Sequence, residues 1–293
     1  MPGRNNVTIS EIRKMVPGRS LFSDKNSARL VIIGGSGEYY GAPVLAANSA
    51  YNSLAALRSG AGYVSIFVPK QILRNARSFS PVLVVKQSGM EFVELTTELK
   101  HSINMANAVI IGMGIGSNAN ALREALKIMN YAVSHEKKII IDADAILLIH
   151  KLKKRTKDIV ITPNDSEFYR LSGIKPSRSD VVERVTAAKA ISKRFGVVVA
   201  LKGHINVISD GTRVKVIQPK SAALATMGTG DVLSGIIGAF LAMGTDAFYS
   251  AVASIYVHSI AGDMLYKEKG SHIIATDVIN IIPEAIKRAT GRK

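Results

Sequence analysis

A short run of small residues beside one aspartate is the clearest candidate for chemistry in the sequence. Gly228, Thr229 and Gly230 precede Asp231, and the apolar run Val232–Met243 that follows is typical of a buried helix. Backbone N–H groups of small residues can converge at a helix N-terminus, where they and the helix dipole bind an anion. Asp231 then has two interpretations. It stabilises the first helical turn, or it is a general base for a hydroxyl that attacks a phosphoryl group.

Other polar residues that follow predicted strands could serve the same phosphate. Asn164 and Glu167 are three residues apart, so on a helix they share one face. They could hold the waters of a Mg²⁺ ion, or they could form only a capping box. Lys202 follows a later strand and could neutralise phosphate charge. Asp142 and Asp144 are secondary candidates for contacts with metal-bound water, or are acids of an ordinary turn.

Short apolar runs that alternate with helical patterns must position these residues. Continuously apolar runs favour strands covered on both faces of a parallel sheet, and their alternation with helices favours an α/β fold. The predicted strands are Leu30–Ile33, Tyr63–Val68, Val82–Val85, Val109–Ile111, Ile139–Ile141, Ile159–Ile161 and Val197–Leu201, then a hairpin of Asn206–Ser209 and Arg213–Ile217. The predicted helices cover about 43–57, a segment ending near 134, and about 230–243, 246–266 and 276–289.

Glycine and polar residues gather at the carboxyl ends of the predicted strands. They form the segments GGSG (34–37), GMGIG (112–116), DAD (142–144), TPND (162–165) and KG (202–203). Ligands of open parallel sheets bind at that edge, so the segments together predict a binding crevice, although each alone is also typical of a turn. Because no linker or internal repeat interrupts the pattern, we expect one domain over residues 1–293, with residues 1–22 as an N-terminal extension or helix.

Several common chemistries are excluded. Cysteine is absent, so disulfides, thiolate metal sites and cysteine nucleophiles are impossible, and the six histidines lack the spacing of a zinc site. No P-loop motif occurs. The segment from Gly112 nearly matches the dinucleotide fingerprint, but its sixth residue is Ser117. The next strand-end acid, Asp142, follows Gly112 by about 30 residues, where about 20 is usual.

Length and charge restrict the class of partner. The 293 residues are 47% hydrophobic, which excludes disorder as the overall class, and their formal charge of +16 attracts polyanions. The basic run Lys151–Lys157 has no interleaved aromatic residues, so it favours a solvated surface over a nucleic-acid site, and a basic nucleic-acid-binding protein is the non-enzyme alternative. Neither a membrane span of about 20 apolar residues nor a signal-peptide core is evident, so we expect a soluble, cytoplasmic protein with no membrane partner.

G-T-G-D at a helix start, N-x-x-E after a strand and K-G after a later strand together resemble the ribokinase-like superfamily. Within it, the chain from about Ser23 to Ala289 resembles the ADP/ATP-dependent NAD(P)H-hydrate dehydratases. The matching stretches are VIIGGSGEYYGAPVLAA (31–47), GAGYVSIFVP (60–69), GMGIG (112–116), IDADAI (141–146), TPNDSEF (162–168), LKGHINVISDG (201–211), ATMGTGDVLSGIIGAFLAMG (225–244) and HSIAGDM (258–264). The resemblance implies a three-layer α/β/α fold with a mostly parallel central sheet.

The resemblance also implies a lyase that repairs hydrated NADH and NADPH (NADHX and NADPHX). ADP, or ATP in some relatives, phosphorylates the hydroxyl on the reduced nicotinamide ring; loss of phosphate then restores the ring, and AMP is released. Mg²⁺ is the expected cofactor, bound through water by Asn164 and Glu167. The other implied roles are a base, Asp231; an anion hole, Gly228, Thr229 and Gly230; substrate contacts, Ala42, Gly114, Asn164 and Asp231; and nucleotide contacts, Lys202, Gly203, His204, Ile205, Asn206 and Gly230.

Two departures from the family pattern bear on these roles. Asn164 stands where many relatives have histidine, and Asn206 stands where the family usually has threonine. A ribokinase-like kinase for a vitamin precursor, a thiazole or pyrimidine alcohol, would use the same Asp231 and is the alternative enzyme. Because relatives assemble into symmetric oligomers, we expect a homo-oligomer such as a tetramer, and a separate epimerase as a partner enzyme.

Overall fold

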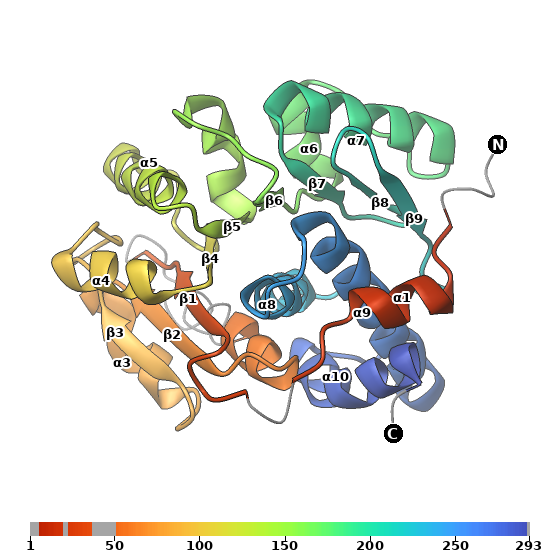
Figure 1. Ribbon diagram of the computed structural model, residues 1–293, viewed down its shortest axis with the longest axis horizontal. Coiled ribbons are helices and arrows are strands. Elements are labelled where there is room, and N and C mark those ends of the chain that lie inside the picture. The colour runs from red at the N-terminus through yellow and green to blue at the C-terminus, as the bar shows by residue number, and fades with distance from the viewer. Residues whose placement is uncertain (1–5, 20–22, 37–50, 292–293) are drawn as a thin grey trace.

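The computed structural model describes residues 6–19, 23–36 and 51–291 (Figure 1). Its core is one nine-stranded sheet in the order β3-β2-β1-β4-β5-β6-β7-β8-β9. Neighbouring strands from β3 to β7 are parallel, and β8 and β9 are antiparallel to their neighbours. The strands are β1 (Arg29–Ile33), β2 (Tyr63–Val68), β3 (Val84–Gln87), β4 (Ala108–Ile111), β5 (Lys138–Ile141), β6 (Ile159–Ile161), β7 (Val198–Leu201), β8 (Asn206–Ser209) and β9 (Val214–Ile217).

Helices cover both faces of the sheet, so the predicted α/β/α layers are confirmed (Figure 1). One face carries α1, α8, α9 and α10, and the other carries α4 to α7. In β1, Leu30 and Ile32 pack into the first of these layers, and Val31 and Ile33 pack into the second. The helices are α1 (Ile9–Met15), α3 (Lys70–Ser78), α4 (Thr97–Met105), α5 (Ala119–Ser134), the 3-10 helix η2 (Ala143–Lys151), α6 (Asp165–Ser172), α7 (Val181–Phe195), α8 (Thr229–Ala242), α9 (Ala247–Lys269) and α10 (Ala275–Thr290).

The observed strands agree with the predicted ones to within a residue or so at each end, except for β3. The predicted strand Val82–Val85 is wrong by two residues, because β3 covers Val84–Gln87 and includes the polar residues Lys86 and Gln87 at the edge of the sheet. The segment after Asp142 is the 3-10 helix η2 rather than a simple turn. The predicted helix over 43–57 falls partly outside the described residues, and its described end, 51–58, is helical. No helix in the described ranges is long and apolar enough to cross a membrane.

Two glycines let α8 approach its neighbours closely. A Cβ on Gly235 would overlap the carbonyl oxygen of Asn52 and would lie 2.9 Å from the Cβ of Ala55, so α8 lies against the backbone of the helix at 51–58. A Cβ on Gly238 would lie 2.7 Å from Cδ1 of Ile110 on β4. Since protein interiors are close-packed, these contacts fix the position of α8, and with it the position of Asp231 in its first turn.

The Gly235→Ala substitution should therefore destabilise the protein by about 1–3 kcal/mol, the usual cost of overpacking. This cost should exceed the gain in helix propensity of about 1 kcal/mol. Urea denaturation of both proteins measures the difference. Thr186→Ala on the exposed face of α7 is the control, and its effect should stay within about 0.5 kcal/mol. A more stable Gly235→Ala protein would show that α8 is not held by this contact.

Candidate functional site

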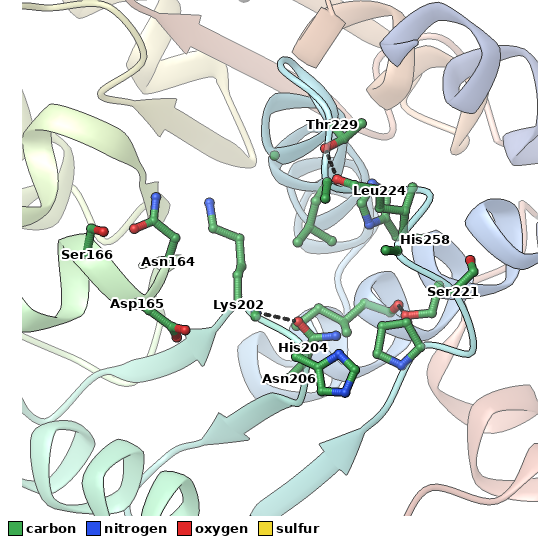
Figure 2. Close-up of a pocket in the computed structure, with 18 residues that line it drawn as sticks. Asn164, Asp165, Ser166, Lys202, His204, Asn206, Ser221, Leu224, Thr229 and His258 are labelled. Atoms are coloured by element: carbon green, nitrogen blue, oxygen red, sulfur yellow. Dashed lines mark hydrogen bonds between the residues drawn. The ribbon is translucent and has the colours of Figure 1, made fainter. Parts of the chain in front are cut away.

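A cavity of about 590 Å³ opens beside the carboxyl ends of β6 and β7 (Figure 2). Its walls come from the start of α6, the turn between β7 and β8, the loop over 218–228, and α8 and α9. The structure thus brings together many of the residues predicted from separate motifs. Those that line the cavity are Asn164, Lys202, Gly203, His204, Asn206, Thr229 and Gly230.

The N-terminus of α8 faces this cavity without a side-chain cap. Gly228 is the N-cap residue, with φ of +85°, and no side chain hydrogen-bonds to the helix start. A Cβ on Gly228 would lie 2.8 Å from the ring of Tyr51, so glycine is needed for both conformation and space. The Thr229 hydroxyl donates to the carbonyl oxygens of Leu224 (2.6 Å) and Thr226 (2.8 Å). The Thr229 hydroxyl is therefore engaged by the preceding loop and is not directed to an anion in the cavity.

The ammonium group of Lys202 lies at the same helix start. Its Nζ is 3.4 Å from the point where a Cβ on Gly230 would be. Burial favours the neutral amine, but the negative charges of Asp142 and Glu167 outweigh burial and raise the pKa of Lys202 above its ordinary value. A cation at the positive end of a helix dipole is unfavourable by itself. Their convergence therefore indicates a site for an anion such as a phosphoryl group.

Asp142 is the counter-charge that keeps Lys202 in place. Its Oδ1 accepts from Lys202 Nζ (3.2 Å) and from the Ala143 N–H (2.9 Å), and its Oδ2 accepts from the Ser234 hydroxyl of α8 (2.5 Å). Burial acts to raise the pKa of Asp142, but the charge of Lys202 and the bond from Ser234 together lower it. With both oxygens engaged, the geometry favours a role in joining β5, β7 and α8 over the metal-water contact that we considered from the sequence.

Asp231 has the properties of a base that works near neutrality. It is partly buried in the first turn of α8, and the Asn52 amide donates to its Oδ1 at 3.4 Å. Burial, and then the negative charge of Asp142, raise the pKa of Asp231 to about 7 in spite of Lys202. A carboxylate with this pKa can accept a proton and is near the optimum for proton transfer at neutral pH.

Asn164 and Glu167 form the capping box of α6. The Asn164 side-chain oxygen accepts from the Glu167 N–H (2.9 Å), and a Glu167 oxygen accepts from the Asn164 N–H (2.8 Å). Burial raises the pKa of Glu167, and the charge of Lys202 opposes the increase. Within the described parts of the chain, no group of three histidine, aspartate or glutamate side chains could hold a metal ion directly.

The GMGIG segment forms a neighbouring loop that does not line the cavity. Gly114 is partly exposed with φ of +63°, and Asp144 accepts from the Gly116 N–H at 3.1 Å. Burial raises the pKa of Asp144. Gly114 and Asp144 therefore lie at the sheet edge near Asp142, while Ala42 lies outside the described residues.

The turn between β7 and β8 is shaped by its own side chains. Asn206 accepts from the Gly203 N–H at 3.2 Å, so its side-chain oxygen stabilises the turn. Ile205 is 3% exposed and packs in the core, so any contact with a nucleotide must use its backbone. On α9, burial and then the charge of Lys202 lower the pKa of His258 to about 4. Lys202 is the one lysine among the described residues that line the cavity, and none of these residues is an arginine.

Arg184 of α7 supports this turn, and our sequence analysis missed it. The side chain is fully buried, and its Nη1 donates to Asp165 (2.8 Å) and to the carbonyl of Ser177 (2.9 Å). Its Nη2 donates to the carbonyl of Lys202 at 3.1 Å and would lie 2.6 Å from a Cβ on Gly203. We did not predict the segment 181–195 as a helix. Had we done so, the position of Arg184 on the apolar face of that helix would have indicated that its side chain is buried.

The comparisons with known proteins agree with this arrangement. The family profile described as NAD(P)H-hydrate dehydratase matches residues 30–284. An ADP-dependent (S)-NAD(P)H-hydrate dehydratase of Nitrosopumilus maritimus is 32% identical over 292 residues, with 97% of each chain covered. A bifunctional NAD(P)H-hydrate repair enzyme of Hyperthermus butylicus is 33% identical over 89% of this chain, which spans only 49% of that protein.

Solved structures show the same fold. The ADP/ATP-dependent NAD(P)H-hydrate dehydratase of Bacillus subtilis, co-crystallised with ATP and Mg²⁺, has a TM-score of 0.74 and 23% identity, with 99% of this chain and 100% of that chain covered. At this identity the likeness shows the fold alone, and a ribokinase-like protein of Enterococcus faecalis shows the same fold, with a TM-score of 0.81, 24% identity, and 98% of this chain and 97% of that chain covered. The chain therefore belongs to the NAD(P)H-hydrate dehydratase family and has the ribokinase-like fold.

Proposed function

We propose that this chain is an ADP-dependent (S)-NAD(P)H-hydrate dehydratase. The observation that carries the proposal is the convergence of the Lys202 ammonium and the N-terminus of α8 beside Asp231, whose pKa is raised to about 7. Two archaeal relatives of nearly the same length, from Nitrosopumilus maritimus and Cenarchaeum symbiosum, carry this name. Their names favour ADP over ATP as the phosphoryl donor.

The adenine nucleotide would lie in the cavity with its phosphates toward α8. The backbone around Gly228, Thr229 and Gly230 would bind the phosphoryl group that is transferred. Lys202 would balance the charge that develops on the phosphate oxygens. The turn at Gly203–Asn206 would border the rest of the nucleotide. The hydrate would contact Asp231, Gly114 and Asn164, and Ala42 stays a contact predicted from the sequence alone.

Phosphorylation turns a poor leaving group into a good one. Asp231 takes the proton of the ring hydroxyl while the oxygen attacks the terminal phosphorus of ADP, a C–O–P linkage forms, and AMP leaves. The lone pair of the ring nitrogen then expels phosphate as the C–O bond breaks. Loss of a proton from the adjacent ring carbon restores the reduced nicotinamide, so the products are NAD(P)H, AMP and phosphate.

Asn164 and Glu167 fit a hydrated Mg²⁺ ion better than a directly bound one. Each uses an oxygen in the capping box of α6. Figure 2 shows Asn164 beside Lys202, and the charge of Lys202 acts on the pKa of Glu167. Mg²⁺ keeps several of its waters in such sites. When bound, the ion would neutralise phosphate charge, and these two residues would orient its waters.

Other properties stay predictions. A single domain over residues 1–293 and a cytoplasmic location are predicted from the sequence pattern, and a homo-oligomer and a separate epimerase are predicted from the family resemblance. The vitamin-precursor kinase would share Asp231 and the anion site but would stop at the phosphorylated product. Release of phosphate together with AMP therefore distinguishes the two enzymes.

Asp231→Asn should lower turnover on the order of 10²- to 10⁴-fold, because it removes the general base and keeps the shape. The assay incubates the protein with hydrated NADH, ADP and Mg²⁺ and follows the returning absorbance of the reduced nicotinamide. Asp180→Asn is a matched control, since Asp180 caps α7 through the Val182 and Glu183 N–H groups, and it should retain activity. A folded and fully active Asp231→Asn protein would remove Asp231 from the mechanism.

The value of kcat/KM should rise with pH up to about 7 and then level off. Asp231 must be ionised to accept a proton, and its pKa is raised to about 7. Below that pH the carboxyl is mostly protonated, so the rate should fall about tenfold for each further pH unit. Initial rates at subsaturating hydrate in a buffer series measure this limb. A constant rate between about pH 5 and 8 would contradict a base with this pKa.

Chelation of Mg²⁺ with EDTA should abolish turnover without lowering the melting temperature of the nucleotide-free protein. The reason is that the described residues form no direct metal-binding group, so no folding energy depends on the ion. Activity assays test the loss of turnover, and thermal melts on the same samples test the unchanged melting temperature. Added Mg²⁺ should restore the rate. A large fall in melting temperature would instead indicate a structural metal.

A further inference from the structure

The loop over 218–228, between β9 and α8, forms one wall of the nucleotide cavity. Its residues Pro219, Ser221, Ala222 and Leu224 all line that cavity. The loop contains turns but no helix or strand. A wall of this kind must be held by contacts from other elements, because a free loop would have to be ordered each time the nucleotide binds.

The end of the loop is held by α8. The Thr229 hydroxyl donates to the carbonyl oxygens of Leu224 and Thr226, and the Thr229 N–H donates to Thr226 at 3.3 Å. These bonds fix the residues next to the anion site. They do not reach Lys220 or Ser221, which lie nearer to β9.

The start of the loop is held by Asp263 of α9. Its Oδ1 accepts from the Lys220 N–H at 3.2 Å and from the Ser221 hydroxyl at 3.3 Å. One carboxylate oxygen thus binds two consecutive loop residues, and hydrogen bonds to an ionised group are stronger than neutral ones. Asp263 does not line the nucleotide cavity, but it lines a second cavity behind the loop, and Ser221 borders both cavities.

Gly262, the residue before Asp263, contacts Leu224 in the middle of the loop. A Cβ on Gly262 would lie 2.6 Å from Cγ and 2.8 Å from Cδ1 of Leu224, so the leucine packs directly on the backbone of α9. Two adjacent residues of α9 therefore contact the loop at two separate points. Figure 2 shows Leu224 and Ser221 on the same side of the cavity, opposite Asn164 and Asp165.

We propose that Asp263 is a positioning residue for nucleotide binding, which holds the loop over 218–228 in place as a wall of the cavity. The proposal rests on the proposed function, because it takes the ligand of this cavity to be ADP. Without the Asp263 carboxylate, the start of the loop is no longer ordered before the nucleotide binds. Part of the binding free energy is then used to order the loop, so the affinity for the nucleotide falls. The anion site keeps its anchor at Thr229, so the chemical step on bound ADP is preserved.

The test compares Asp263→Ala and Asp263→Asn in the full chain. For Asp263→Ala we expect the KM and the directly measured Kd for ADP to rise about 10- to 100-fold, the effect of losing hydrogen bonds to a charged group. The kcat value at saturating ADP and the KM for the hydrate should change by less than about twofold. Asp263→Asn retains an acceptor oxygen, so its values should lie between those of Asp263→Ala and the unaltered protein.

Asp277→Ala is the matched control. Asp277 of α10 also accepts a backbone N–H, that of Ile274 (3.0 Å), and a side-chain donor, Lys269 (2.7 Å), but it lines neither cavity. Its removal should leave KM and Kd for ADP unchanged. Amide hydrogen exchange should be faster over 218–228 in both Asp263 variants and unchanged there in Asp277→Ala.

The outcomes separate this inference from the proposed function. Unchanged ADP affinity in both Asp263 variants, an equal loss in Asp277→Ala, or a fall in kcat with constant KM would overturn the positioning role. If the unaltered chain binds ADP but does not repair the hydrate, the proposed function fails, and weaker ADP binding by Asp263→Asn still supports the positioning role. If Asp263→Ala does not fold, the affinity and exchange of Asp263→Asn decide the question.

Discussion

Two positive groups meet at one point of this molecule, and the surrounding structure keeps them together. The Lys202 ammonium lies beside Gly230 at the uncapped start of α8. This arrangement persists because Asp142, 60 residues from Lys202 and 92 residues from Ser234, binds both. The parallel order β5-β6-β7 brings the ends of these strands to one edge of the sheet. The sheet topology therefore brings distant residues together at the site that we propose for the phosphoryl group.

The surroundings of Asp142 and Asp231 shift their pKa values in opposite directions, although the two side chains are identical. Asp142 and Asp231 are both withdrawn from water and both lie near Lys202. Asp142 receives the ammonium and a hydroxyl directly, so its pKa is lowered and it remains a counter-charge. Asp231 receives a long bond from Asn52, and burial, followed by the negative charge of Asp142, raises its pKa to about 7. Opposite shifts in neighbouring acids are a common way to assign separate roles to them.

The parts of the structure that could be read from the sequence are those with a strong local signal. The buried strands, the hairpin, and the helix starts at Asn164 and Gly228 are marked by apolar runs and capping residues. The polar helices α3 and α4 were not predicted, because each has nine residues and buries only two of them, so the apolar signal of each is short. The direction of the Thr229 hydroxyl and the buried contacts of Arg184 depend on segments far away in the chain. Such contacts have no signature in local spacing.

The tight packing of α8 at Gly235 and Gly238 has a consequence for how the family can diversify. Because α8 has almost no room at these two glycines, a larger side chain at either position would displace the helix or its neighbours. The loop over 218–228 and the turn between β7 and β8 are held largely by the side chains of Asp263, Asn206 and Arg184, so a change in one of these side chains can alter their shape. Changes in what the cavity binds should therefore arise at its rim, while the start of α8 keeps its position.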